Sequence, residues 1–265
     1  MSRLGKLFVF VLVAGCAMAS AQSQVSSGQI YGSQVKAVSL GNPVTEPPEV
    51  NPVAHVREAQ SWEYGPFINY GTGVGNRSDF KFLWAGAQLS KPLSPVVHAG
   101  FLSGQFEFGG NIMPLWQAYT PAPHLENFVC GTSQGGSVNC KLPVGGGTFR
   151  GVSLTPVILR WNFLTKSRRF QPWFQGAGGL IYTTHKFPPN VQSTQTVNGV
   201  PGIDGGTCVW NFTPQGGFGA HIFTGAKHSW DVGVNGVHIS SASLGDRNPG
   251  VNASVQVQVG YTFWK

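Results

Sequence analysis

The stretch VNASVQVQVGYTFW, which runs from Val251 to Trp264, alternates apolar and polar residues. Its apolar series is Val251, Ala253, Val255, Val257, Val259, Tyr261 and Phe263, and its other series is Asn252, Ser254, Gln256, Gln258, Gly260 and Thr262. Successive side chains of a β-strand point to opposite faces, so this period predicts a strand with one apolar face. Such a strand fits a transmembrane barrel or a water-soluble β-sandwich with one buried face.

Similar runs occur along the chain from Trp62 onward and predict eight strands. They are about Ser61–Gly73, Asp79–Leu89, Val96–Pro114, Phe149–Leu164, Phe170–His185, Cys208–Thr224, His228–Ser241 and Asn252–Trp264. The sixth run alternates almost as clearly as the eighth, whereas the second and fourth alternate poorly. The aromatic residues near the predicted strand ends favour the barrel over the sandwich.

The connections between these strands support the same fold. Ser90–Pro95, Thr165–Arg169 and Gly225–Lys227 are short, whereas Leu115–Thr148, Lys186–Thr207 and Ala242–Val251 are longer. The first connection, Val74–Ser78, does not help this pattern. Transmembrane barrels have short periplasmic turns and long outer loops. We therefore expect an all-β fold, an eight-stranded antiparallel up-and-down barrel whose interior is filled by side chains.

The composition excludes several classes of protein. Charged residues make up 10% of the chain and aromatic residues 12%, which argues against disorder. Glycine is frequent but shows no three-residue period, which excludes collagen. The formal charge of +7 is modest, and neither a phosphate-binding loop nor a zinc-ligand spacing occurs. We therefore expect no nucleic-acid partner, no metal and no cofactor.

The N-terminal residues read as an export signal. Arg3 and Lys6 precede a short apolar core, and Ala19-Ser20-Ala21 is a small-residue cleavage site, so residues 1–21 are a predicted signal peptide. An alternative is lipidation at Cys16 after Val13-Ala14-Gly15. Residues 22–60 are polar and interrupted by prolines, which predicts a disordered tail. Residues 61–265 would then form the barrel, placed in the bacterial outer membrane.

The cysteines agree with export from the cytoplasm. Cys130 and Cys140 lie in one stretch rich in glycine and serine, where a disulfide would close a small loop. Cys208 is then left over unless it pairs with one of them.

One segment, VHISSASLGDRNPGVN from Val237 to Asn252, combines residues that could carry chemistry. Residues two apart on a strand share a face, so His238 and Ser240 are predicted neighbours at the outer end of the seventh strand. They fall on the same face of this strand as Trp230 and Val232, and we assign that apolar face to lipid. A histidine beside a serine can act as a general base and a nucleophile. The pair alone is also explained by polarity at the barrel rim.

From Val232 to Lys265 the chain resembles the lipid A 3-O-deacylases of the PagL type, often grouped with the acyloxyacyl hydrolases. The family motif is His-x-Ser-Asn-Ala, followed by a loop and an acid. The resemblance implies that His238 is the catalytic base and Ser240 the nucleophile, with Asn252 at the position of the acid that orients the histidine. It places Ser241 and Ala242 beside the nucleophile and Asn248 near the oxyanion. Asp246, an acid in this loop, is the reserve candidate.

Two residues depart from the family motif, because Ser241 replaces an asparagine and Asn252 replaces a glutamate. An amide can orient an imidazole, but it cannot stabilise the imidazolium as a carboxylate does. Strand alternation also groups Asn252 with the lumen-facing residues, so only a bulge or twist would bring it to His238. The position of Asn252 is therefore the weakest part of the predicted site.

The resemblance implies an outer-membrane esterase that removes the 3-O-linked acyl chain of lipid A, with lipopolysaccharide as its partner and a homodimer left open. The alternatives are a non-catalytic barrel with structural or adhesive outer loops and a soluble lipid-binding barrel.

Overall fold

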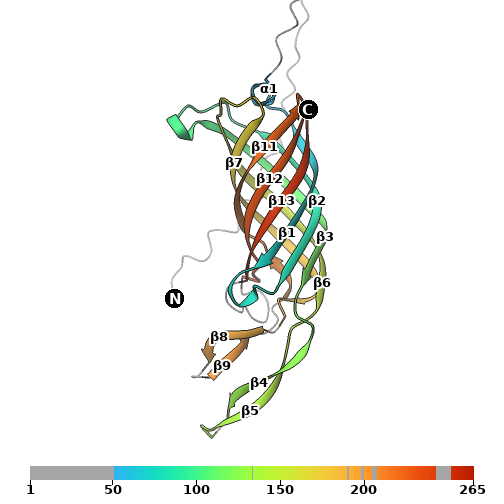
Figure 1. The fold of residues 1–265 in the computed structure, drawn as a ribbon, viewed down its shortest axis with the longest axis vertical. Helices are drawn as coiled ribbons and strands as arrows, with labels where there is room; N and C mark the ends of the chain where they lie inside the picture. The colour runs from blue at the N-terminus through green and yellow to red at the C-terminus, as the bar shows by residue number, and fades with distance from the viewer. Residues whose placement is uncertain (1–50, 133, 190, 198–199, 205–207, 243–251) are drawn as a thin grey trace, which may run out of the picture. The chain divides into compact units, whose positions relative to one another are not determined.

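The computed structural model describes residues 51–132, 134–189, 191–197, 200–204, 208–242 and 252–265. Eight long strands pair with their neighbours in an antiparallel sheet, and pairing between β6 and β7 closes the sheet on itself (Figure 1). These strands are β1 (Glu63–Gly73), β2 (Lys81–Pro92), β3 (Gly104–Tyr119), β6 (Thr148–Phe163), β7 (Phe170–Phe187), β11 (Gln215–Gly225), β12 (His228–His238) and β13 (Ala253–Trp264). The closed sheet confirms the predicted eight-stranded barrel.

Side chains alternate between the two faces of this wall as the sequence predicts. On β13, Val255 and Val257 are about half exposed, whereas Gln256 and Gln258 are buried. A polar interior and an apolar exterior that includes exposed Trp230 and Phe218 are the features of a barrel that spans the bacterial outer membrane. Within the described residues, none of the helices has the length and apolar character needed to cross a membrane.

Prolines and glycines alter two of the predicted strands. β3 begins at Gly104 instead of Val96, because a turn and the short helix η2 (Gly100–Leu102) occupy the residues before it. The sixth predicted strand is divided into β10 (Cys208–Phe212) and β11, with Pro214, which has no N–H to donate, between them. The short helix η1 (Gly75–Arg77) joins β1 to β2.

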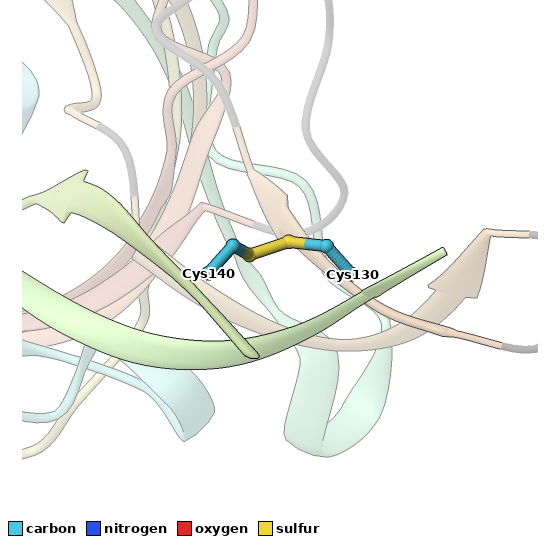
Figure 2. Close-up of a disulfide and its surroundings, with 2 residues drawn as sticks. All are labelled: Cys130 and Cys140. Carbon is cyan, nitrogen blue, oxygen red and sulfur yellow. A yellow bond between two sulfur atoms is a disulfide. The ribbon is translucent and has the colours of Figure 1, made fainter. Parts of the chain in front are cut away.

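The two longest predicted loops contain hairpins that were not predicted from the sequence. β4 (His124–Gly131) pairs with β5 (Ser137–Val144), and β8 (Val191–Val197) pairs with β9 (Val200–Asp204). Cys130 of β4 and Cys140 of β5 form a disulfide across the first hairpin, as predicted (Figure 2). Cys208 has no disulfide partner among the described residues.

The predicted disordered tail requires a correction at its end, because residues 52–58 form helix α1 (Pro52–Glu58). The Asn51 side chain accepts a hydrogen bond from the Ala54 N–H and caps the helix, which then begins at a proline. Its apolar residues, Val53 and Val56, are buried against Phe223 of β11 and Trp264 of β13, whose burial stabilises the helix. Residues 22–50 of the tail and the predicted signal peptide lie outside the described residues.

α1 lies at the end of the barrel where the chain also ends, because the main chains of Trp62 and Lys265 hydrogen-bond to each other. The short connections between β6 and β7 and between β11 and β12 lie at this end, which we therefore assign to the periplasm. The hairpin β4–β5 is inserted at the opposite, outer ends of β3 and β6.

Buried side chains fill the described interior in two layers. One layer is an apolar cluster that includes Trp84, Trp116 and Phe82, with Val237 near the end of β12 and Ile239 just after it. The other is polar and contains Glu63, Glu107, Arg160, His221 and Asp231, which are almost completely buried. The filled interior agrees with the expected behaviour of eight-stranded barrels, which leave no aqueous channel.

Candidate functional site

The apolar layer of the lumen determines where His238 and Ser240 point. Val237 and Ile239 are 1% and 2% exposed and belong to the buried aromatic cluster. Because neighbouring residues on an extended chain face opposite sides, burial of these two side chains turns His238 and Ser240 toward the exterior. Both are partly exposed, on the same face as Trp230 and Val232. The structure thus brings the predicted base and nucleophile to the outer wall.

Main-chain hydrogen bonds hold this segment against its neighbours beyond the end of β12. Ser240 and Phe212 of β10 exchange two backbone bonds, of 3.0 and 2.7 Å, and the His238 N–H donates to the Pro214 carbonyl at 2.9 Å. On the other side, the Ile239 N–H donates to the Asn252 carbonyl at 2.8 Å. The His238–Ser240 segment is therefore fixed from both sides.

A tight turn follows Ser240. The Ala242 N–H donates a 3.1 Å hydrogen bond to Ser240 Oγ, and Ala242 has a φ of 49°, in the left-handed region that non-glycine residues seldom adopt. A backbone of this kind costs about 1–3 kcal/mol and is found most often at functional sites. The turn places a main-chain N–H beside the oxygen of the predicted nucleophile.

The His238 and Ser240 side chains share a face but are not hydrogen-bonded to each other; both lie in the described part of the chain. Hydrogen bonds between catalytic groups are often long in the absence of substrate and shorten in the complex. A rotation about the Ser240 Cα–Cβ bond would release its hydroxyl from the Ala242 N–H.

The other predicted site residues are not gathered around His238. Asn252 is 3% exposed and its main chain pairs with Ile239, so its side chain is buried on the lumen side, as strand alternation predicts. Its Nδ2 atom has no hydrogen-bond partner within the described residues. Ser241 is also buried, whereas Ala242 is exposed. Asp246 and Asn248 lie outside the described residues.

A row of three glycines crosses the outer wall next to His238. Gly216 of β11 pairs directly with Gly176 of β7 on one side and with Gly236 of β12 on the other. A Cβ atom built on Gly176 would meet no atom within 4 Å, and one on Gly216 or Gly236 would have a nearest atom 3.7 or 3.8 Å away. The outer surface of the barrel is therefore recessed along this row, because none of the three residues has a side chain. Gly236 precedes His238 by two residues, which corresponds to about 6.8 Å along the strand.

Larger side chains border this glycine row on both sides. On the periplasmic side, Phe218 pairs with Phe174 and Val234, and both phenylalanines are more than half exposed. On the outer side stand Phe212 and the His238–Ser240 segment. The glycine row thus forms an apolar trough (defined here by Gly176, Gly216 and Gly236) that reaches the predicted catalytic pair from the side.

The polar layer of the lumen was not foreseen from the sequence. Arg160 Nη1 lies 3.1 Å from Glu63 and 3.4 Å from Glu107, and Nη2 lies 3.5 Å from Asp231. The guanidinium also lies over the Trp173 ring, 4.6 Å from the ring centroid. Several strands with few charges each carry one charged residue on the polar face. This pattern is the sequence signal that could have indicated the cluster.

Three of these residues, Glu63, His221 and Asp231, have donor atoms within 4.8 Å of one another and are of the types that bind metal ions. Arg160 Nη1, however, lies 3.2 Å from His221 Nε2 and 3.1 Å from the Glu63 carboxylate, and Nη2 lies 3.5 Å from the Asp231 carboxylate. Its fixed positive charge opposes a second cation in the same space, so the geometry favours a structural ion-pair network.

A comparison with protein families identifies a match between residues 132–262 and the model of "Lipid A 3-O-deacylase (PagL)". This match confirms the resemblance predicted from the sequence, and the matched range includes His238 and Ser240. Among the curated proteins, none matches the chain.

Several solved structures of outer-membrane proteins are similar to the chain. Neisserial surface protein A has 10% identity and a TM-score of 0.41, with 76% of this chain and 96% of that chain covered. The outer membrane enzyme PagL has 14% identity and a TM-score of 0.36, with 74% and 98% covered. OprG from Pseudomonas aeruginosa has 10% identity and a TM-score of 0.33, with 78% and 96% covered.

Proposed function

Because the chain matches the lipid A 3-O-deacylase (PagL) family over residues 132–262, we propose that it is an outer-membrane esterase that removes the 3-O-linked acyl chain of lipid A. The observation that carries the proposal is the outward orientation of His238 and Ser240, which burial of Val237 and Ile239 imposes. A catalytic pair on the outer wall meets its substrate within the membrane, without any passage through the lumen.

In this mechanism, Ser240 Oγ attacks the ester carbonyl while His238 accepts the hydroxyl proton. The collapse of the tetrahedral intermediate breaks the bond to the sugar oxygen, which takes the proton from His238 as it leaves. Water, activated by His238, then hydrolyses the acyl-enzyme and releases a free fatty acid. Every step uses the same imidazole as base and then as acid.

The Ala242 N–H is our candidate donor for the oxyanion, because it already lies 3.1 Å from Ser240 Oγ. We propose Asn248 and Ser241 as supporting residues of the same loop, as the family motif implies. Asn252 contributes to the site through its main-chain carbonyl, which accepts a hydrogen bond from the N–H of Ile239, the residue between His238 and Ser240. Orientation of His238 by the Asn252 side chain would need that side chain to leave its buried position, and Asp246 is the reserve candidate for this role.

The experiment that tests the proposed function is the mass of lipid A from a Gram-negative host that expresses the chain. We expect a loss equal to one 3-hydroxyacyl group replaced by hydrogen, and no loss with Ser240→Ala. A correctly inserted barrel that leaves the lipid A mass unchanged would favour the alternative, a non-catalytic barrel with structural or adhesive outer loops.

The trough beside His238 leads to a prediction about Gly216. We place the acyl chain of the substrate in this trough. The substitution Gly216→Leu should therefore lower the rate of deacylation about tenfold or more for long acyl chains, because the leucine side chain would fill that space. Folding should be preserved, since a Cβ at this position has room. The measurement is the rate of fatty-acid release from lipid A in detergent.

Gly225→Leu is the matched control for this substitution. Gly225 is at the other end of the same strand and also has open space at its Cβ position. Equal rates for Gly216→Leu and the wild type would show that the trough does not hold the acyl chain.

A further inference from the structure

A recess of about 670 Å³ is hollowed into the wall on the far side of the barrel from His238 and Ser240. It lies over β2, β3 and β6, and β3 is four strands from β12 in either direction around the sheet. Its rim consists of the exposed apolar side chains Leu89, Phe108, Ile112 and Leu154. We call this recess the β2–β3 groove.

Irregular strand pairing produces the groove. Pro114 of β3 and Pro156 of β6 cannot donate to the sheet, and both lie where the register shifts. Gly86 of β2 lies opposite the first of these shifts and Gly110 of β3 opposite the second. A Cβ on Gly86 would come within 2.0 Å of the Ile112 carbonyl oxygen, so the close approach requires a glycine there. The β2–β3 groove is thus a consequence of the local backbone geometry.

The groove opens toward the periplasmic end at a cation and an indole ring. Lys91 Nζ lies 5.1 Å from the centre of the Trp62 ring, and both residues line the groove. Trp62 is 46% exposed, as expected for an aromatic residue at the membrane–water interface. Further cations at this end, in short turns or at the C-terminus, include Lys166, Arg168, Arg169, Lys227 and Lys265. The mouth of the groove therefore suits an anionic group.

The position of the groove mouth and the length of the groove together identify the leaflet. From Lys91 to Ala87, the part of β2 that lines it extends for about 13 Å. The hydrocarbon of one leaflet is about 15 Å deep, half of the usual 30 Å core. A chain that enters beside Lys91 therefore ends within the periplasmic leaflet, whose lipids are glycerophospholipids.

We propose that the β2–β3 groove binds one acyl chain of a glycerophospholipid of the inner leaflet, with the lipid phosphate against Lys91. The apolar rim would cover the hydrocarbon, and the ammonium would pair with the phosphate at the edge of the membrane. The site is separate from the proposed catalytic pair and does not depend on the esterase activity.

The test is native mass spectrometry of the barrel in detergent after incubation with vesicles of phosphatidylglycerol. We expect the wild type to retain one lipid per barrel. Ala87→Phe, which fills the groove from an exposed position, and Lys91→Met, which removes the cation, should each reduce the lipid-bound fraction at least threefold. Heat-dependent gel mobility would show that both variants fold.

Val257→Phe and Lys227→Met are matched controls, because they make the same kinds of change outside the groove. Equal retention of lipid by all four variants would overturn the proposal. A dimer that Ala87→Phe converts to a monomer would also overturn it, because the occupant would then be a second copy of the chain.

Discussion

Replacing Arg160 with methionine should destabilise the folded barrel by about 3–5 kcal/mol, the cost of leaving buried charges without their partner. Arg160 is 2% exposed and lies within 3.5 Å of Glu63, Glu107 and Asp231. Those carboxylates come from β1, β3 and β12, so Arg160 of β6 connects strands from several parts of the sheet. Methionine fills similar space but cannot compensate their charge.

The measurement is urea unfolding in lipid vesicles, followed by tryptophan fluorescence. Arg150→Met is the control, because Arg150 lies on the same strand with its side chain exposed. Adding Glu63→Gln to Arg160→Met should recover part of the lost stability, since it removes one of the uncompensated carboxylates. Equal stabilities for Arg160→Met and Arg150→Met would contradict the view that the ion-pair network supports the barrel.

Ser240→Ala and His238→Ala should each lower the rate of deacylation by roughly a thousandfold or more, and the double variant should be no slower than the worse single variant. The reason is that a nucleophile and its base act as a unit, so removal of either ends covalent catalysis. If the two residues acted independently, the loss of rate in the double variant would instead be the product of the two single losses.

The rates can be measured as fatty-acid release from lipid A by purified barrels in detergent. His228→Ala is the matched control, because His228 lies on the same outward face of β12 at its periplasmic end. A double variant much slower than either single variant would contradict the proposed unit of two residues.

Alternation made the strands predictable, since every second residue of β13 faces lipid and the others face the lumen. The same parity predicted the outward positions of His238 and Ser240 and the lumen-facing position of Asn252. These features depend only on neighbours along the chain, which the sequence displays directly.

Features that depend on contacts between distant residues were not predictable in this way. Glu63 and Arg160 are far apart in the sequence and meet only when the barrel closes. Helix α1 is too short to be stable alone, and burial of Val53 and Val56 against Phe223 and Trp264 makes it form.

The glycines illustrate the same limit. The sequence does not distinguish Gly217, where a Cβ would come within 2.1 Å of the Asn235 side chain, from Gly216, where a Cβ would have room. The first is required by packing, whereas the second leaves a trough on the surface. Only the strand register, which pairs Gly216 with Gly176 and Gly236, distinguishes these two roles.

The most direct test of the central claim is the covalent labelling of Ser240 by a long-chain alkyl fluorophosphonate, located by peptide mass spectrometry. If His238 activates Ser240 on the outer wall, the peptide that contains Ser240 should carry the label in the wild type and lose it in His238→Ala. Absence of label from the folded wild-type barrel, or equal labelling of Ser240 in both proteins, would contradict the account.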